Sequence, residues 1–274
     1  MAEPDPRPSQ AVPNEVLAVR HGTLETTRAH QYLNYDVYGE ADAPMRLDYY
    51  FWIIRSEAGI VLVDTGFSAE AARRRGREVL VDVPDALRTL GIDADTPVDL
   101  VLTHAHYDHA GNLDAVPNAR VFVARAELEF WTSPTAQTVN FQSVMEDADL
   151  AALATARAEG RVTLVDGVHD LAPGVRLIPM PGHTPGQLIV TVATSRGTIV
   201  LASDAVHFEE ELERDMPFRH TTDLVGLHEG FALLRRWRAE GSVIDVISGH
   251  DPATMRRFPP LPGPLAAHAV IVAG

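Results

Sequence analysis

The chain contains no cysteine and no lysine, and all 23 of its basic residues are arginine. Without cysteine there are no disulfides, no thiolate nucleophile and no cysteine-ligated zinc. Without lysine, Schiff-base chemistry and a phosphate-binding lysine of the Walker type are excluded. Any catalysis must therefore come from histidine, aspartate, glutamate, serine, tyrosine or a bound metal ion.

Long apolar runs are also missing, since no stretch approaches the roughly 18 residues that a membrane-spanning helix needs. The first 16 residues contain acids and prolines but no apolar core of a signal peptide. We therefore expect a cytoplasmic protein with no membrane partner. Residues 1–13 are expected to form a flexible tail, and residues 14–274 a single domain.

Acidic residues outnumber basic ones, 38 against 23, which gives a formal net charge of −15. Such a surface repels polyphosphates, so nucleic acids and anionic membranes are unfavourable partners. Of the 274 residues, 46% are hydrophobic. That proportion is enough for one large core or for two fused halves.

Strand and helix patterns alternate along the chain. Residues 49–54 and 59–63 indicate a hairpin with its turn at residues 56–59, and residues 223–240 carry a helical apolar stripe that Gly241 ends. Further helices are predicted at residues 68–80, 85–90, 125–133 and 141–159, and further strands at 98–102, 121–123, 161–165, 175–178, 187–192, 198–201 and 243–247. Because strands and helices are interleaved, the fold class is α/β or α+β, with layers on both sides of sheets.

A dense group of metal-competent side chains follows the apolar run 98–102. The segment T-H-A-H-Y-D-H places His104, His106, Asp108 and His109 within six residues. Neutral imidazole and carboxylate are the usual zinc donors when thiolate is absent. Alternate residues of an extended segment point the same way, so His104 and His106 can reach one metal. Asp108 and His109, as the chain turns into the next helix, can reach a second; a solvated polar loop is the alternative.

Three more candidate ligands lie in matching contexts. His183 in P-G-H-T-P-G, Asp204 in L-A-S-D and His250 in S-G-H-D each follow an apolar strand. The carboxyl ends of strands are where α/β sheets place their sites. Taken singly, the His183 segment could be only a turn and Asp204 only a helix cap. Together with the H-x-H-x-D-H run, they complete a set of five histidines and two aspartates.

In this combination and order, the motifs resemble those of the metallo-β-lactamase superfamily, from about Val16 to His250. The resemblance implies a four-layer αββα sandwich of two similar halves with the site at one edge, and one catalytic domain over residues 14–274. It also implies a ligand set: His104, His106 and His183 on the first metal, Asp108, His109 and His250 on the second, and Asp204 bridging the two.

Val63-Asp64-Thr65-Gly66 belongs to the same family pattern. The resemblance makes Asp64 an acceptor that holds a ligand histidine in orientation. Turn chemistry before Gly66 explains the aspartate equally well.

Two zinc ions per chain are the expected cofactor, with manganese, iron or cobalt as other candidates. Two such ions about 3.5–4 Å apart lower the pKa of a shared water, and the metal-bridging hydroxide attacks a carbonyl that one metal polarises. Asp108 is placed to take the proton and deliver it to the leaving group. We therefore expect a metal-dependent hydrolase of carboxylic esters or lactones.

Within the superfamily, the chain most resembles the N-acyl homoserine lactonases, which are quorum-quenching enzymes, through residues 46–54 and 202–208. The expected substrate is an N-acyl homoserine lactone or a related lactone. Those lactonases carry a tyrosine three residues after the bridging aspartate, where this chain has His207. His207 either donates the same catalytic hydrogen bond or is an ordinary half-exposed histidine. Another small lactone, such as a pyridoxolactone, fits as well.

Other activities compete with this one. A thioesterase or esterase of the glyoxalase II type shares all seven ligands but needs basic residues for glutathione carboxylates, and the C-terminal part shows no such cluster. A β-lactamase is disfavoured because one kind needs cysteine and the other lacks an aspartate in the role of Asp204. The net charge disfavours a nuclease. A non-catalytic metal-binding or partner-binding protein is the remaining alternative.

Three segments have uses that the sequence leaves open. Residues 125–160 include Phe130, Trp131, Phe141, Val144 and Met145, which either wall an apolar acyl pocket or pack on the core. Residues 216–220 are a candidate loop near the site. Residues 49–52 suit the surface of a homodimer as well as a core.

Overall fold

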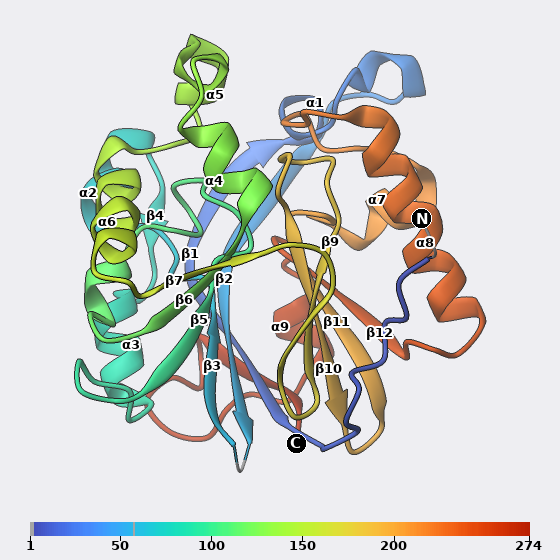
Figure 1. The fold of residues 1–274 in the computed structure, drawn as a ribbon. Coiled ribbons are helices and arrows are strands. Elements are labelled where there is room, and N and C mark those ends of the chain that lie inside the picture. The colour runs from blue at the N-terminus through green and yellow to red at the C-terminus, as the bar shows by residue number, and fades with distance from the viewer. Residues whose placement is uncertain (1–2, 57) are drawn as a thin grey trace.

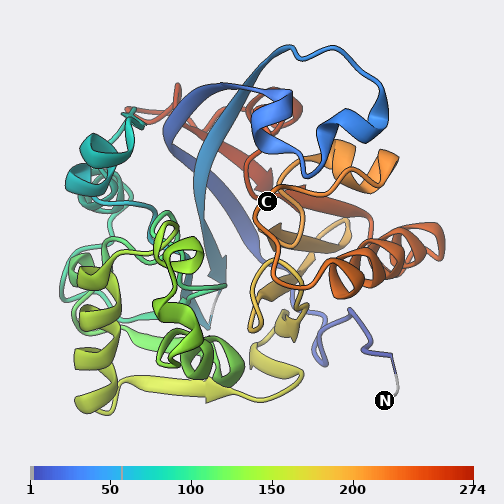
Figure 2. The ribbon, with the colours of Figure 1, turned by 90° about the horizontal axis from the view of Figure 1, so that it is seen from above.

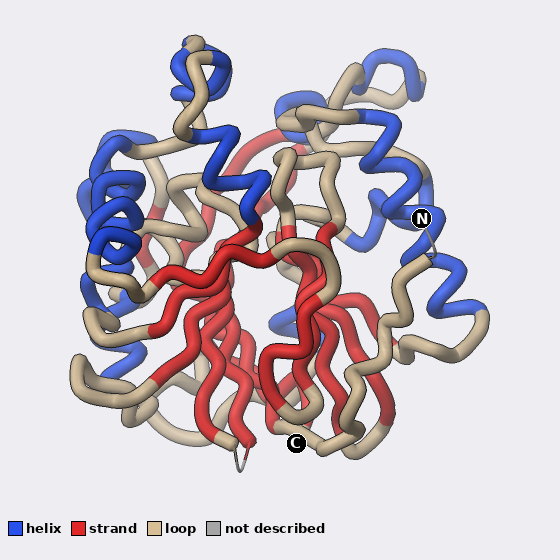
Figure 3. Tube along the Cα trace, viewed as in Figure 1, coloured by secondary structure: helices blue, strands red, loops and turns tan. Residues whose placement is uncertain are grey.

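The structure is a computed structural model that describes residues 3–56 and 58–274. Within these residues two β-sheets pack face to face, and helices cover the outer face of each (Figure 1). Figure 3 shows the strands of both sheets in the middle and the helices on the two sides. The expected αββα sandwich is therefore confirmed.

The larger sheet contains eight of the described strands, and the first and the last strand of the chain both belong to it. Its strands lie in the order β13 (Ala269–Ala273), β1 (Glu15–Thr27), β2 (Pro44–Ser56), β3 (Gly59–Val63), β5 (Val98–Val101), β6 (Arg120–Ala124) and β7 (Val162–Val165), and β4 (Glu78–Val79) pairs with β1. Strands β3, β5, β6 and β7 run parallel, with Leu62 opposite Leu100. Their carboxyl ends therefore meet at one edge.

The smaller sheet has five strands and supplies the other half of that edge. Its order is β12 (Asp245–Ser248), β11 (Gly197–Ser203), β10 (Leu188–Thr194), β9 (Val175–Pro179) and β8 (His169–Ala172). Only β11 and β12 are parallel; the other pairs are antiparallel.

Helices and short 3-10 turns complete the layers and the loops above the edge. They are α1 (Arg28–Gln31), η1 (Tyr35–Tyr38), α2 (Ala69–Arg75), α3 (Val83–Thr89), η2 (Leu113–Ala115), α4 (Arg125–Trp131), η3 (Thr135–Gln137), α5 (Val139–Gln142), α6 (Asp147–Ala158), α7 (Glu209–Arg214), α8 (Leu224–Ala239) and α9 (Thr254–Arg257). Figure 2, which looks down on the edge, shows α1 and η1 in blue, α4 to α6 in green and yellow-green, and α7 and α8 in orange around it.

Three apolar layers hold the sandwich together. Leu87 of α3 and Leu153 of α6 pack on the outer face of the larger sheet. Trp52 and Val190 belong to the layer between the sheets, and Phe231 of α8 packs on the smaller sheet. Because central strands are buried on both faces, they read as continuous apolar runs, which is why they were predictable from sequence.

The hairpin of β2 and β3 and the long helix α8 confirm their predictions, although Glu57 of the turn lies outside the described residues. The predicted helix 68–80 is too long, because Gly76 takes a φ of 64° and ends α2 at Arg75. The predicted helix 141–159 is two helices, α5 and α6. Residues 49–52 are buried in the cores. Strands β1, β4, β8 and β13 and helices α1, α7 and α9 were not predicted from the sequence.

The N-terminal segment lies along the smaller sheet. Arg176 Nη1 donates to the Asp5 carbonyl oxygen at 3.0 Å, and the Ser9 amide donates to Asp170 Oδ1 at 3.3 Å. A flexible tail at residues 1–13 and a single domain over residues 14–274 stay predictions. Among the described residues, no helix has the length and apolarity to cross a membrane.

Candidate metal centre

The seven predicted ligands converge at the edge where the strands of both sheets end. The H-x-H-x-D-H run follows β5, His183 lies in the loop between β9 and β10, Asp204 follows β11 and His250 follows β12. All seven side chains are buried. The prediction that the chain turns into a helix at Asp108 and His109 is wrong. After His109 the chain continues through turns to the short η2, and no α-helix follows the motif directly.

The candidate donor atoms form two groups that meet at one carboxylate. His104, His106, His183 and Asp204 each offer an atom within 4.8 Å of the others, and Asp108, His109 and His250 do the same. Asp204 Oδ2 lies 3.3 Å from His183 Nε2, whereas Asp204 Oδ1 lies 3.2 Å from His109 Nε2 and 3.0 Å from His250 Nε2. Each oxygen of Asp204 therefore faces a different group.

Outer partners fix the direction of three imidazoles. His183 Nδ1 is 2.7 Å from the His220 carbonyl oxygen, and His250 Nδ1 is 2.8 Å from the Asp48 carbonyl oxygen. A carbonyl oxygen only accepts, so each Nδ1 carries the proton and each Nε2 directs a lone pair inward. His109 Nδ1 lies 2.7 Å from Asp64 Oδ2 and is held in the same way. This arrangement is characteristic of metal-binding histidines.

Asp64 both orients a candidate ligand histidine and forms a tight turn, the two roles that its sequence context allows. Its Oδ1 accepts from the Thr103 amide at 2.8 Å, and its Oδ2 accepts from Thr103 Oγ1 at 2.8 Å and faces His109. Its φ of 62° is also that of a tight turn residue. Aspartate tolerates this left-handed conformation better than most residues because its short side chain bonds locally.

The chemistry of the donor set fits a divalent transition metal. His104 Nε2, His109 Nε2 and Asp204 Oδ1 are buried and, within the described residues, form no hydrogen bond of good geometry, and such atoms are costly unless something binds them. His106 Nδ1 and His183 Nε2 face each other at 2.9 Å. Burial and the surrounding imidazoles lower the pKa values of His104, His106 and His183 well below the usual value. Their lone pairs are therefore available to a cation.

Glu127 on α4 is a buried carboxylate that sequence reasoning missed. Its Oε1 accepts from the Ala105 amide at 2.9 Å and from Trp131 Nε1 at 2.7 Å. Its Oε2 accepts from Thr184 Oγ1 at 2.7 Å and from the Gly186 amide at 3.0 Å. One side chain thus ties the H-x-H loop to the His183 loop. In the sequence, Glu127 resembles any charged residue of a surface helix, so no local signal marks it.

The backbone at Gly186 approaches α4 closely. A Cβ placed on Gly186 would lie 2.2 Å from the Glu127 amide nitrogen. Only glycine fits there, which explains the last residue of the P-G-H-T-P-G motif.

His207 is not a half-exposed histidine. Its ring is 1% exposed and stacks on Phe218 with the ring centroids 3.7 Å apart. His207 Nε2 lies 3.1 Å from Asp204 Oδ2, and His207 Nδ1 lies 3.3 Å from Glu211 Oε1. Burial lowers the pKa of His207, but the two carboxylates outweigh it and raise the pKa to about 9. Donor atoms of Asp204, His207 and His250 also lie within 4.8 Å of one another.

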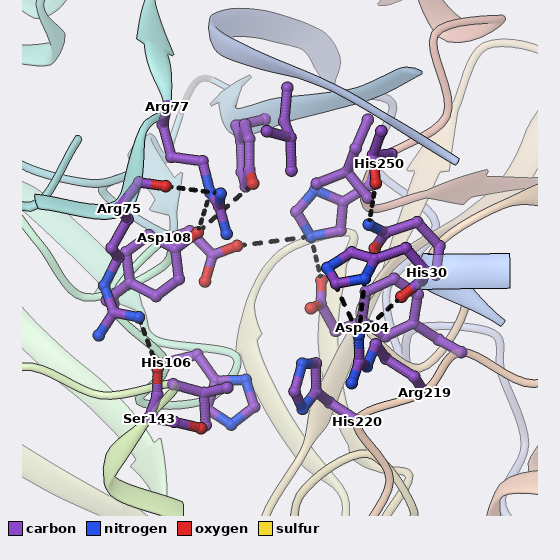
Figure 4. A pocket seen from close by; sticks show the side chains of 18 of the residues that line it. His30, Arg75, Arg77, His106, Asp108, Ser143, Asp204, Arg219, His220 and His250 are labelled. Atoms are coloured by element: carbon purple, nitrogen blue, oxygen red, sulfur yellow. Dashed lines mark hydrogen bonds and ion pairs between the residues drawn. The ribbon is translucent and has the colours of Figure 1, made fainter. Parts of the chain in front are cut away.

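A cavity of about 300 Å³ opens above the donor groups (Figure 4). The cavity is lined by five of the candidate metal ligands, Asp108, Asp204, His106, His183 and His250, and by Arg75, Arg77, Arg219, His30, His220, Tyr49, Tyr107, Val144, Phe218 and residues 24–26, 31, 47 and 143. The predicted loop 216–220 therefore does border the site. A charged and aromatic wall surrounds the metal-binding residues.

The aromatic segment 125–160 is divided between two uses. Trp131 and Met145 are buried in a small core, with Phe130 packed against it. Phe141 and Val144 line a second hollow of about 420 Å³ that shares His106 and His183 with the first. Only part of this segment can therefore form an apolar pocket wall.

Comparison with known proteins decides the family. The model of the metallo-β-lactamase superfamily matches residues 46–265. The chain belongs to this superfamily. Metallo-β-lactamase-fold hydrolases use metal ions, and this chain is accordingly a metal-dependent hydrolase.

Several relatives are lactonases. The N-acyl homoserine lactonase AiiA of Bacillus thuringiensis subsp. kurstaki is 25% identical, over 64% of this chain and 70% of the relative. The lactonase AiiB of Agrobacterium fabrum is 28% identical, over 73% of this chain and 78% of its own. A solved N-acyl homoserine lactone hydrolase with N-hexanoyl-L-homoserine at its metal centre has a TM-score of 0.73 at 20% identity, covering 90% of this chain and 96% of that one. The dizinc lactonase AidC has a TM-score of 0.71 at 18% identity, covering 91% and 92%.

Proposed function

We propose that this superfamily member opens a lactone ring, in an N-acyl homoserine lactone or a related lactone, with two zinc ions per chain. The placement of Asp204 is the observation that carries the proposal, because its two oxygens face two separate groups of buried donors. The lactonase relatives support the substrate class.

Each side chain has a role in this proposal. His104, His106 and His183 would hold the first ion, Asp108, His109 and His250 would hold the second, and Asp204 would contribute to both. Bound there, the two ions supply the Lewis acidity that activates water and polarises the lactone carbonyl. Asp108 lines the cavity and stays close to both histidines of its group, with its Oδ2 3.8 Å from His250 Nε2. We assign it the transfer of the proton to the ring oxygen as the carbon–oxygen bond breaks.

His207 is proposed as the catalytic hydrogen-bond donor in place of the usual tyrosine. Its Nε2 lies 3.1 Å from Asp204 Oδ2 and its Nδ1 lies 3.3 Å from Glu211 Oε1, so the ring is fixed beside the bridging carboxylate, behind the residues that line the cavity. Replacing His207 by glutamine should lower kcat by roughly 10²-fold, the low end of what a positioned acid contributes. A His207→Tyr variant should keep most of the activity. Unchanged rates in His207→Gln would remove this residue from the reaction.

A glyoxalase II type thioesterase is the second candidate, because of one observation. The C-terminal part of the sequence lacks the basic cluster that such an enzyme needs for glutathione carboxylates. In the fold, Arg75, Arg77 and Arg219 nevertheless line the cavity. Anionic thioesters therefore belong in any substrate panel.

The test is hydrolysis by zinc-loaded protein of N-acyl homoserine lactones, small γ-lactones, a cephalosporin, a glutathione thioester and a phosphodiester, ranked by kcat/KM. Lactones should rank first; a ranking with lactones last would overturn the substrate. Elemental analysis should find about two ions per chain, and less than one would overturn the centre. His183→Gln should lose metal and activity, whereas the control His228→Gln, a partly exposed histidine on α8, should keep both.

The expectations about partners belong to the same proposal. The net charge of −15 disfavours nucleic acid. A cytoplasmic location and a homodimer stay predictions, which fractionation and light scattering can test.

A further inference from the structure

Two arginines in the cavity stand out because, within the described chain, neither forms an ion pair with a carboxylate. Arg75, their neighbour in the wall, is a contrast: its Nε bonds Glu146 Oε1 at 2.8 Å and its Nη2 bonds the Met145 carbonyl oxygen at 2.9 Å. Arg75 is therefore structural. Arg77 and Arg219 line the same cavity but have only neutral partners.

Arg77 is held rigidly. Its Nε donates to the Tyr107 hydroxyl at 2.9 Å, and its Nη1 donates to the Arg75 carbonyl oxygen at 2.8 Å. Gly76 ends α2, and the two residues after Arg77 form β4, which pairs with β1. The backbone on both sides of Arg77 is therefore fixed. No hydrogen bond is made by Nη2 to any residue that the structure describes. A half-buried guanidinium already ordered in this way loses little entropy when it binds an anion.

Arg219 lies across the cavity. Figure 4 shows Arg75 and Arg77 beside Asp108 on one side, and Arg219 beside His30 and His220 on the other. Its Nη1 donates to the His30 carbonyl oxygen at 3.0 Å, and its side chain is exposed. Its charge therefore acts mainly on approaching ligands.

With two divalent ions bound, the cavity would carry a charge opposite to that of the molecule. Its lining carboxylates are Asp108 and Asp204, which belong to the donor groups, and Glu25 at the exposed rim. Two divalent ions would outweigh the first two carboxylates, and Arg77 and Arg219 add positive charge. A cationic cleft in a chain of net charge −15 concentrates anions locally.

We propose that the substrate carries an oxyanion group, a carboxylate or a phosphonate-like group, away from the bond that reacts. Arg77 binds this group, and Arg219 attracts it during entry. The inference rests on the proposed lactonase function and narrows its substrate class. Water adds to the lactone carbonyl carbon, the ring carbon–oxygen bond breaks, the ring oxygen takes a proton, and the new carboxyl group loses one. A monoanionic lactone thus becomes a dianionic hydroxy acid.

Matched lactones test the proposal. The first pair is N-glutaryl homoserine lactone, which ends in a carboxylate, and its terminal primary amide, which is neutral and nearly isosteric. A second pair carries the carboxylate or its amide on the γ-lactone ring, and a phosphonate analogue of the glutaryl compound tests the other oxyanion. The measured quantity is the ratio of kcat/KM for the charged substrate to that for its neutral partner.

At low salt, the ratio should be roughly 10 or more for at least one pair, as expected for a charge-assisted hydrogen bond. Arg77→Gln should bring it close to one in about 0.5 M salt, where the remaining attraction by Arg219 is screened. Arg219→Gln should lower it several-fold at low salt and little in about 0.5 M salt, because the charge of an exposed side chain is screened. Arg73→Gln, an exposed arginine on α2 outside the cavity, is the charge-matched control and should leave it unchanged.

Ratios near one for every pair, or ratios that Arg77→Gln leaves unchanged, would overturn the proposal. A binding assay separates this result from a failure of the lactonase function. By calorimetry, zinc-loaded protein should bind succinate, glutarate or adipate at least about tenfold more tightly than butanoate, and Arg77→Gln should remove the difference. If no lactone is hydrolysed but this difference is found, the lactonase function fails and the anion site stands; equal affinities would overturn the anion site.

Discussion

Replacing Glu127 by glutamine keeps the size of the side chain but turns one accepting oxygen into a donor. In the native protein each carboxylate oxygen receives two hydrogen bonds, from Ala105 and Trp131 on one side and from Thr184 and Gly186 on the other. The amide nitrogen is best placed on the second side, because the Thr184 hydroxyl can turn and accept from it. The Gly186 N–H then has no acceptor.

The magnitude follows from these contacts. One buried donor without a partner costs about 1–3 kcal/mol. The remaining bonds weaken because a neutral oxygen replaces a charged one, which adds about 1 kcal/mol. Glu127→Gln should therefore lower the free energy of unfolding by about 2–4 kcal/mol. Since the clamp also positions the loops of His104, His106 and His183, zinc affinity should fall by roughly 10–100-fold.

Guanidinium unfolding of the zinc-free protein measures the first effect, and competition with a chromogenic chelator measures the second. Glu129→Gln is the matched control, because Glu129 lies on the same helix and is exposed. The control should remain within about 0.5 kcal/mol of the parent. If Glu127→Gln behaves like the control in both assays, the view of Glu127 as a clamp between two metal-binding loops is wrong.

Three further perturbations have expected outcomes. Asp64→Asn keeps the turn but weakens the contact with His109, and should reduce zinc affinity roughly 10–100-fold in chelator competition; unchanged affinity would refute the orienting role. Chelation should abolish hydrolysis, and zinc at 100 times its Kd should restore about 2.7 kcal/mol of stability, seen as a higher Tm; equal Tm values would argue against the site. Burial raises the pKa of Asp149 to about 7, so the folded chain keeps a proton there that the unfolded chain releases. Stability should fall from about pH 4 to 7, and Asp149→Asn should flatten this loss in urea titrations.

Much of the centre could be predicted from sequence because its donors are concentrated and lie at recognisable strand ends. His104, His106, Asp108 and His109 lie within one short segment, and His183, Asp204 and His250 each follow an apolar strand. Strand direction alone brings such positions to one edge. The hydrogen-bond acceptors that orient the histidines could not be predicted from the sequence. His183 and His250 bond carbonyl oxygens of His220 and Asp48, and backbone acceptors leave no mark in the sequence.

The elements that were missed share a physical cause. β13 is the edge strand of the larger sheet and pairs with β1, so the register of this pair depends on contacts across most of the chain, such as Ala18 opposite Val270. The basic wall of the cavity was missed because Arg77 and Arg219 are far apart in sequence and are brought together only by the fold. Glu127 is hidden for the same reason, since its four donors come from three segments.

Two residues with a strained backbone hold the strand ends of the two sheets together at the metal-binding edge. Asp64 and Ser203 both have positive φ, 62° and 46°, although neither is glycine, and each follows or ends a strand beside a ligand loop. Such backbone costs about 1 kcal/mol or more at each position. Thr103 joins the two: its hydroxyl lies 2.8 Å from Asp64 Oδ2 and 2.8 Å from Ser203 Oγ. The ends of β3, β5 and β11 are thus linked in one buried cluster directly behind His104 and Asp204. The hydrogen bonds offset the strain, and the backbone that they hold supports both metal-binding segments.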